Sequence, residues 1–422
     1  MKNPVHYLLL LLMLVLSFGV RAQTGSKLQV LYQTKQFFDL RDEVKKQQSG
    51  KSLDILFYRG AVANKFNQIE TSITLLQNFL KKFKDDPLRR DALELLADDY
   101  VKIYQYAQAA DTYKILLKKY GSELGADKSR DANNSYRLFD AARRIPPQTV
   151  SFRKSTIVQG TRDQAGLFNI PIEVNAQNAD FVFDTGANIS TVTATTARKL
   201  NLKIIDAQIS VGTSTDARVE SKLGVAKTLV IGNIVLQNVL FLVMPDDALY
   251  ISPIKYQING IIGFPVIEAL RKISINRKDE ISIPANTGRE DSRLPNLCLD
   301  ELLPLVSVNL NNQRLTFSLD SGATITTLYP PFYKFYDMKI KKLEPQIAKI
   351  GGAGGISEVL VYRLPSLNLI IAGKAAKLSD VELLTKAIND QSRYFAGSIG
   401  QDVIKQFEKL TLDFQSMELK FE

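Results

Sequence analysis

Histidine, cysteine and tryptophan are almost absent from this chain of 422 residues. The one histidine is His6, the one cysteine is Cys298, and there is no tryptophan. His6 lies in an N-terminal segment that we expect to be removed as a signal peptide, so the mature chain should lack a histidine for a metal site or a Ser-His-Asp triad. One cysteine cannot form an intramolecular disulfide. We expect Cys298 to be a small buried hydrophobe, because a catalytic thiol usually needs a histidine base. If the protein is an enzyme, carboxylates are its natural catalytic groups, and we expect neither a metal nor a cofactor.

Long apolar runs are also scarce, and the longest lies at the N-terminus. Lys2 precedes an apolar run over 8–16, and Val20-Arg21-Ala22 resembles a cleavage site before Gln23. This pattern predicts a signal peptide over 1–22 and a protein exported to the periplasm or secreted. The run is short for a membrane span, although an uncleaved anchor is the alternative. We expect no membrane span after cleavage.

Dense blocks of one charge are missing as well. The formal net charge is +10, yet the 54 lysines and arginines are spread over the whole chain. This distribution indicates solubility and attraction to anionic surfaces. Nucleic-acid binding is not expected.

Residues 27–145 have the pattern of an all-α domain. Glycine is scarce there, Pro87 is the lone internal proline, and apolar residues recur at intervals of three and four. The positions from Leu28 to Val44 predict a first amphipathic helix. Segment 60–83 is echoed by 97–120 at an offset of 37 residues. The echo is similar to a tetratricopeptide repeat, with a plain array of helical hairpins as the alternative. Such arrays bind a protein partner or brace a neighbouring domain.

The sequence pattern changes to one typical of β-structure near residue 150, after Pro146-Pro147 ends the helical pattern. Short β-branched runs alternate with turn residues, as in antiparallel sheets. Two hairpins are predicted on the same plan, from 170–174 with 181–183 and from 305–310 with 315–317. The domains that we expect are a signal peptide (1–22), a helical domain (27–145), a first β lobe (150–283), a linker (284–296) and a second β lobe (297–422).

One motif occurs twice, each time directly after an apolar strand. The copies are Asp184-Thr185-Gly186-Ala187 and Asp320-Ser321-Gly322-Ala323. Each is followed at a similar distance by an apolar-glycine pair, since Asp184 to Gly263 spans 79 residues and Asp320 to Gly400 spans 80. Matched spacing over several elements indicates a tandem of two homologous β lobes.

These motifs resemble the pepsin and retropepsin superfamily of aspartic proteases, in particular single-chain bacterial proteins with two retropepsin-like lobes. The resemblance covers about 150–422. It implies an all-β bilobal protease fold, so the whole chain is expected to be an α+β multidomain protein. It implies Asp184 and Asp320 as the catalytic pair. The residues expected to brace their loops are Thr185, Gly186, Ser321, Gly322, Ile262, Gly263, Ile399 and Gly400, and those expected in substrate-binding flaps are Gly212, Thr213, Ile350, Gly351, Gly352, Ala353 and Gly354.

Two aspartates brought face to face can share one proton and activate a water molecule for amide hydrolysis. Ala187 and Ala323 offer no hydroxyl to the carboxylates, and fewer hydrogen bonds leave the pKa less depressed. This predicts activity at pH 5–7 rather than in strong acid. The glycine run at 351–355 has a second interpretation as a phosphate loop, but no Lys-Ser/Thr follows it.

The main prediction is an exported aspartic endopeptidase that acts on peptide or protein substrates. One chain supplies both halves of the site, so we expect a monomer. A second hypothesis is a catalytically silent peptide-binding or scaffold protein that recognises partners through the helical domain. A third is an enzyme restricted to one partner, delivered or autoinhibited by that domain.

Overall fold

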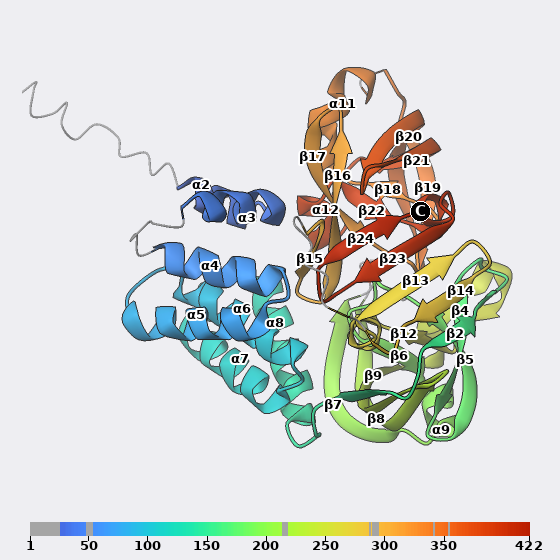
Figure 1. The fold of residues 1–422 in the computed structure, drawn as a ribbon, viewed down its shortest axis with the longest axis horizontal. Helices are drawn as coiled ribbons and strands as arrows, with labels where there is room; N and C mark the ends of the chain where they lie inside the picture. Colours follow the sequence, from blue (N-terminus) through green and yellow to red (C-terminus); the bar gives the residue numbers. More distant parts are fainter. Residues whose placement is uncertain are drawn as a thin grey trace, which may run out of the picture.

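The structure is a computed structural model that describes residues 26–47, 54–212, 218–286, 288, 295–340, 342–352 and 355–422. A helical region lies beside a larger β region that is stacked in two halves (Figure 1). We call residues 149–283 the first β half and residues 297–422 the second β half. No helix in these described segments is both long and apolar enough to cross a membrane.

The helical region is a series of short helices that pack in chain order. They are α2 (Lys27–Gln33), α3 (Phe37–Lys46), α4 (Asp54–Lys65), α5 (Ile69–Lys82), α6 (Arg89–Lys102), α7 (Tyr106–Tyr120) and α8 (Ala126–Ala142). The prediction of one helix from Leu28 to Val44 is wrong, because the chain breaks between α2 and α3. Lys35 has a φ of 54° there, and a left-handed residue cannot continue a right-handed helix.

The 37-residue echo corresponds to two helical hairpins, α4–α5 and α6–α7. Their turns have matching backbones, since Asn67 has a φ of 57° and Tyr104, 37 positions later, has a φ of 60°. A buried polar group joins the two hairpins. Ser72 donates to Asp99 at 2.6 Å, and Asn64 Nδ2 donates to Asp99 at 2.8 Å.

The first β half is built around a nine-stranded sheet with the order β1-β9-β6-β12-β5-β4-β8-β7, and β3 pairs with β4. Its β4–β5 hairpin is the one predicted from the alternating pattern. The elements of this half outside the sheet described below are β1 (Thr149–Phe152), β3 (Thr161–Arg162), β4 (Phe168–Val174), β5 (Gln177–Phe183), β6 (Ser190–Thr193), α9 (Ala194–Lys199), β7 (Lys203–Gly212), β8 (Arg218–Ile231), β9 (Ile234–Met244), η1 (Asp246–Leu249), β10 (Tyr250–Ile251), η2 (Ser252–Ile254), β11 (Tyr256–Gln257), β12 (Gly260–Ile262) and α10 (Phe264–Ala269).

The second β half repeats these strand connections. The parallel pairs β5–β12 and β6–β9 recur as β17–β22 and β18–β21. The elements of this half outside the sheet described below are β15 (Leu297–Asp300), β16 (Leu303–Leu310), β17 (Gln313–Leu319), β18 (Thr327–Leu328), η3 (Pro330–Phe332), α11 (Tyr333–Ile340), β19 (Gln346–Gly352), β20 (Gly355–Ile371), β21 (Lys374–Leu384), α12 (Asp390–Tyr394), β22 (Gly397–Ile399) and α13 (Gln401–Ile404).

A five-stranded sheet joins the two β halves. Its order is β2 (Thr156–Gln159), β14 (Glu280–Ile283), β13 (Lys272–Asn276), β23 (Lys409–Asp413) and β24 (Glu418–Phe421). At its centre, β13, the last strand but one of the first half, pairs with β23, the last strand but one of the second, so that Ser274 lies opposite Thr411 and their hydroxyls are 2.8 Å apart. The halves therefore meet through backbone hydrogen bonds as well as through their cores.

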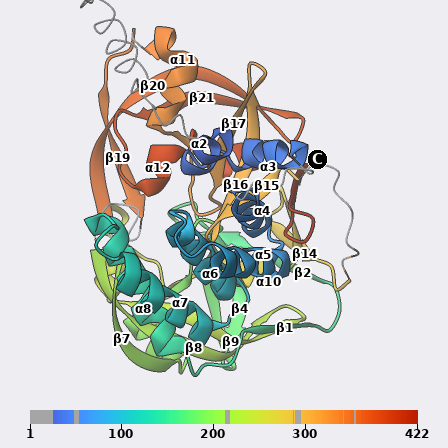
Figure 2. The ribbon, with the colours of Figure 1, turned by 90° about the vertical axis from the view of Figure 1, so that its left-hand side faces the viewer.

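The helical region packs against both β halves, and Figure 2 shows the helices lying across them. Buried residues of α2 to α6 share a cluster with the second half, while those of α6 to α8 share one with the first. Cys298 is fully buried in the former, as predicted, and burial raises the pKa of its thiol. Two lysines, Lys35 and Lys65, each lie 2.8 Å from a carboxylate oxygen of Asp300. The helices are thus tied to the β region by apolar packing and by buried charge.

Candidate active site

The two repeated motifs meet at the interface of the β halves. Asp184 follows β5 and its N–H donates to the carbonyl of Ile262 at 3.1 Å. Asp320 follows β17 and its N–H donates to the carbonyl of Ile399 at 3.0 Å. Each aspartate is thus held at the end of its strand by the neighbouring strand, β12 or β22. Sequence reasoning predicted this bracing role for Ile262 and Ile399.

The glycine of each motif allows the opposite carboxyl group to approach. A Cβ at Gly186 would lie 2.7 Å from Cγ of Asp320, and one at Gly322 would lie 2.5 Å from Cγ of Asp184. Real Cβ atoms do not come so close to another carbon atom, so any other residue at either position would displace the opposite carboxyl group. The geometry therefore brings Asp184 and Asp320 together, each against the loop that carries the other.

Reciprocal hydrogen bonds lock the two loops together. The N–H of Thr185 donates to Oγ of Ser321 at 2.9 Å, and the N–H of Ser321 donates to Oγ1 of Thr185 at 2.9 Å. The hydroxyls complete the pattern by donating across the interface, from Thr185 to the Leu319 carbonyl and from Ser321 to the Phe183 carbonyl, both at 2.8 Å. All four bonds are buried, so water competes little for them.

The later glycines pack beneath the loops. A Cβ at Gly263 would lie 2.6 Å from the carbonyl carbon of Ile189, and one at Gly400 would lie 2.5 Å from that of Ile325. Their N–H groups donate to side-chain hydroxyls of the same half, Ser190 and Thr326, both at 3.0 Å. The two bracing glycines that sequence reasoning selected therefore occupy equivalent places under the two aspartate loops.

The two carboxyl groups differ in their hydrogen bonds. Asp184 Oδ1 accepts the N–H of Gly186 at 2.7 Å. Asp320 Oδ1 accepts the N–H groups of both Gly322, at 2.9 Å, and Ala323, at 3.0 Å. Burial raises the pKa of both aspartates, and the facing charge of Asp320 raises the pKa of Asp184 further. Like charges this close cannot both ionise easily, so the pair is expected to titrate as one unit that retains a proton.

The predicted flap residues lie at the ends of two equivalent hairpins. Gly212 ends β7 opposite Arg218 of β8. The segment Ile350-Gly351-Gly352 ends β19, with Gly352 opposite Gly355 of β20. Thr213, Ala353 and Gly354 lie outside the described residues. Among the described residues, no hydrogen bond links either hairpin to the two aspartates.

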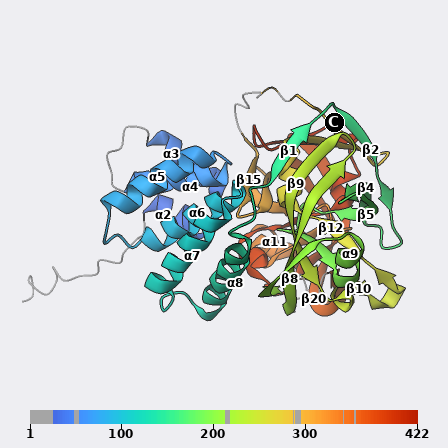
Figure 3. The same cartoon turned by 90° about the horizontal axis from the view of Figure 1, so that it is seen from below.

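Sequence reasoning missed the support of the first hairpin by helix α8. Arg218 of β8 pairs with Asp131 of α8 at 2.9 Å, and the N–H of Ser210 donates to Asn134 Oδ1 at 3.4 Å. Figure 3 shows α8 beside β8. These contacts join residues about 80 positions apart, and no local pattern in the sequence indicates them.

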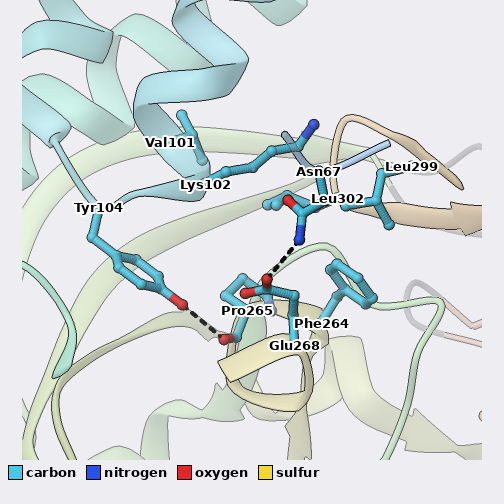
Figure 4. Close-up of a pocket in the computed structure, with 9 residues that line it drawn as sticks. All are labelled: Asn67, Val101, Lys102, Tyr104, Phe264, Pro265, Glu268, Leu299 and Leu302. Carbon is cyan, nitrogen blue, oxygen red and sulfur yellow. Dashed lines mark hydrogen bonds between the residues drawn. The ribbon is translucent and has the colours of Figure 1, made fainter. Parts of the chain in front are cut away.

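A small cavity lies where the helices meet both β halves (Figure 4). It is lined by Asn67, Val101, Lys102, Tyr104, Phe264, Pro265, Glu268, Leu299 and Leu302. Its polar groups bond to one another, since Asn67 donates to Glu268 at 3.0 Å and Tyr104 donates to the Pro265 carbonyl at 3.1 Å. It is a packing junction between regions. In the part of the chain that the structure describes, no three His, Cys, Asp or Glu residues gather as a metal site.

Comparison with known families bears on the first of the two loops. Residues 170–266 match the model of the aspartyl protease family. The match includes Asp184 and Gly263, and it ends before the second motif at Asp320. No curated protein matches the chain. Over this segment the chain is similar to aspartyl proteases, and the suggestion of protease activity comes from that similarity.

Proposed function

We propose that the protein is an aspartic endopeptidase in which Asp184 and Asp320 form the catalytic pair. The observation that supports this best is the reciprocal arrangement of the two loops. Each carboxyl group lies against the glycine of the opposite loop, and buried bonds between Thr185 and Ser321 fix the register. Two carboxyl groups placed so closely can hold one proton between them, which is the state that peptide hydrolysis requires.

The two aspartates have different roles in this proposal. Asp320 is the ionised partner, because its Oδ1 accepts two N–H groups and the hydrogen bond from Asp184 favours its charged form, and Asp184 carries the proton. Asp320 accepts a proton from the attacking water as the new C–O bond forms. Asp184 donates its proton to the peptide carbonyl oxygen. The tetrahedral intermediate then collapses and the C–N bond breaks. The leaving nitrogen takes the proton from Asp320, and one hydroxyl of the intermediate returns its proton to Asp184 as the carboxyl product forms.

The substrate is an extended peptide that lies between the two hairpins. Its backbone pairs with hairpin edges and its side chains enter apolar pockets. The exposure of apolar side chains near the loops supports a preference for hydrophobic residues. Ile325, on the loop after Asp320, is 49% exposed, and Ile356, beside the β19–β20 tip, is 40% exposed.

The remaining features of the proposal concern the whole chain. The two β halves act as the lobes of one bilobal protease, divided at 150–283 and 297–422 with 284–296 as the linker. The helical region over 27–145 is a tetratricopeptide-like array that can receive a protein partner. The protein is exported after removal of residues 1–22, remains in the periplasm or is secreted, and works as a monomer.

The deciding experiment uses protein that starts at Gln23 and a diverse peptide library at pH 4 to 7.5. Wild type, Asp184→Asn and Asp320→Asn are compared with and without a statine-type inhibitor. Asp247→Asn, on the exposed η1 segment, is the matched control. We expect cleavage by wild type and the control, and a loss of about a thousandfold or more in both dyad variants.

Two results would contradict the proposal. Cleavage that survives in Asp184→Asn or Asp320→Asn would assign the activity to other groups. Peptide binding without cleavage at any pH would support the silent peptide-binding hypothesis. Circular dichroism spectra of all variants distinguish loss of chemistry from loss of fold.

A further inference from the structure

Gln401 contacts the second aspartate loop from below. It begins helix α13, directly after Gly400, and its side chain is only 4% exposed. Its Nε2 donates to the carbonyl oxygen of Ser321 at 2.7 Å, and its backbone N–H donates to the carbonyl of Ala323 at 2.9 Å. The residue thus bonds to the loop on both sides of Gly322.

The bond to Ser321 affects Asp320 through one rigid unit. The carbonyl of Ser321 and the N–H of Gly322 belong to the same planar peptide. That N–H donates to Asp320 Oδ1 at 2.9 Å. By holding the carbonyl end, Gln401 fixes the direction in which the N–H end points.

The orientation of the Gln401 amide is itself fixed from the first β half. Arg162 Nη2 donates to Gln401 Oε1 at 3.2 Å. A guanidinium group can only donate, so the oxygen of the amide must face Arg162 and the nitrogen must face Ser321. Arg162 is held in turn by Asp279, with Nε 3.1 Å from both carboxylate oxygens, and its guanidinium lies 4.6 Å from the Phe168 ring centroid.

The equivalent position under the first loop carries an apolar residue. Phe264 follows Gly263, and its N–H donates to the Ala187 carbonyl at 2.8 Å, as that of Gln401 does to Ala323. Its ring packs instead at 5.4 Å from the ring of Phe414. A phenylalanine side chain has no donor for the carbonyl of Thr185. Of the two loops, only the second is therefore supported by a side-chain hydrogen bond at this position, and that support acts on Asp320.

We propose that Gln401, oriented by Arg162 and Asp279, is a positioning residue that keeps Asp320 as the ionised member of the pair. This inference rests on the proposed protease function. It assigns a role to three residues outside the two aspartate loops, Gln401, Arg162 and Asp279. Since it depends on one peptide unit, it can be tested by changing a single side chain at each of the two equivalent positions.

The test compares Gln401→Met, Gln401→Glu and the matched control Phe264→Met. Methionine removes both polar bonds of Gln401. Glutamate keeps the bond from Arg162, but its carboxylate cannot donate to Ser321. Both Gln401 variants are expected to raise the acid-limb pKa of kcat/KM by about one unit, because a less well-oriented N–H stabilises the carboxylate less. At a pH below that limb kcat/KM should fall about tenfold, mainly through kcat, and KM should stay within about twofold.

Phe264→Met should leave the acid limb in place, whatever its effect on stability. Arg162→Lys retains a donor for Gln401 Oε1 and should restore most of the wild-type profile that Arg162→Met loses. An unshifted acid limb in both folded Gln401 variants would overturn the proposal. If Gln401→Met fails to fold, Gln401→Glu and the Arg162 pair give the same test.

A second readout separates this inference from the proposed function. Aspartate carboxyl groups labelled with ¹³C are titrated by NMR in wild type, Gln401→Met and Phe264→Met, with Asp320→Asn for assignment. We expect the Asp320 titration to move to higher pH only in Gln401→Met. That result in a protein that cleaves no peptide would contradict the protease proposal and support the positioning role, while an unmoved titration would contradict the positioning role itself.

Discussion

The two β halves have the same strand connections, but their surroundings differ. Both place an aspartate after a strand, a glycine against the opposite carboxyl group and a second glycine beneath the loop. The first half has Phe264 under its loop, and the second has Gln401. The repeated part is therefore the part that must bring two carboxyl groups together. The differences lie in the residues beneath the loops, Phe264 and Gln401, where they can make the two carboxyl groups unequal.

The two hairpins differ in the same way. Helix α8 covers the side of β7–β8 through Arg218–Asp131 and Asn134–Ser210. On β19–β20, Ile347 lies opposite Leu360, and these side chains are 67% and 48% exposed. The first hairpin is thus a docked element, whereas the second presents an open apolar face. We expect β19–β20 to move more than β7–β8 when a substrate enters.

The largest effect on stability is expected where the helices hold the second half. Asp300→Asn leaves Lys35 and Lys65 without their shared carboxylate, and breaking a buried ion pair costs about 3–5 kcal/mol. Glu268→Gln is the comparison at the first half, where Asn67 bonds to a carboxyl group whose pKa burial raises. It should cost less than about 1 kcal/mol. Urea unfolding at pH 7 measures both, and equal losses would contradict this difference.

The next effect tests the symmetry of the loops themselves. Thr185→Val and Ser321→Ala each remove a hydroxyl that accepts one buried N–H and donates to one carbonyl. Each should lower the free energy of unfolding by about 1–3 kcal/mol and lower kcat/KM by about tenfold or more. The losses should be alike. A neutral result for one variant alone would show that the lock is one-sided.

The pH dependence of stability should reflect buried carboxyl groups in two places, Asp99 in the helical region and the aspartate pair between the β halves. Burial raises the pKa of Asp99 to about 7, against 3.8 for an ordinary aspartate. The stabilising contribution of Asp99 to the free energy of unfolding is fully present below about pH 4 and is lost as the pH rises through 7. Between these values the folded state still holds a proton that the unfolded state has released, so raising the pH favours unfolding. The aspartate pair acts with the same sign. We therefore expect the melting temperature to fall between pH 5 and pH 8.

Asp99→Asn and Asp184→Asn should each make that fall shallower, and thermal melts at intervals of half a pH unit measure the slope. Asp247→Asn, at an exposed position on η1, is the control for the effect of charge alone. A melting temperature that rises from pH 5 to pH 8 in wild type would contradict the assignment of raised pKa values to these buried groups.

The smallest effect is expected at the docked hairpin. Arg218→Ala or Asp131→Ala removes a largely exposed ion pair, which contributes less than about 1 kcal/mol to stability. Freeing the hairpin should still change KM a few-fold, because the substrate must then order it. Arg363→Ala, which removes pairs with the exposed Asp380 and the buried Glu382 in the second half, is the control for loss of an arginine pair away from α8. Identical KM values for all of these variants would show that the α8 contact has no influence on binding.

Local patterns predicted much of the fold and of the site. The repeated motif predicted the meeting of Asp184 and Asp320 and the bracing places of Gly263 and Gly400, because strand, turn and glycine requirements are local. The prediction of one long first helix was wrong, since the apolar spacing continues through the left-handed residue Lys35. The roles proposed for the named site residues stay predictions.

What the sequence did not indicate depends on contacts between distant segments. Nothing near Ser274 or Thr411 shows that the two strands pair with each other across the halves. Gln401 looks like an ordinary polar residue at the start of a short helix until its amide is seen between Arg162 and Ser321. Its neighbours are 239 and 80 positions away. Such contacts are fixed by the assembled core and not by local preferences.

The presence of both halves in one polypeptide has a consequence for the direction of the reaction. Two identical chains related by a twofold axis would carry the same residue under both loops, and either carboxyl group could hold the proton. Under the positioning role that we propose for Gln401, Phe264 and Gln401 break that degeneracy in this chain before any ligand arrives. A peptide also has a direction, from its amino to its carboxyl end. A pocket with one fixed acid and one fixed base can therefore favour one of the two ways of threading it.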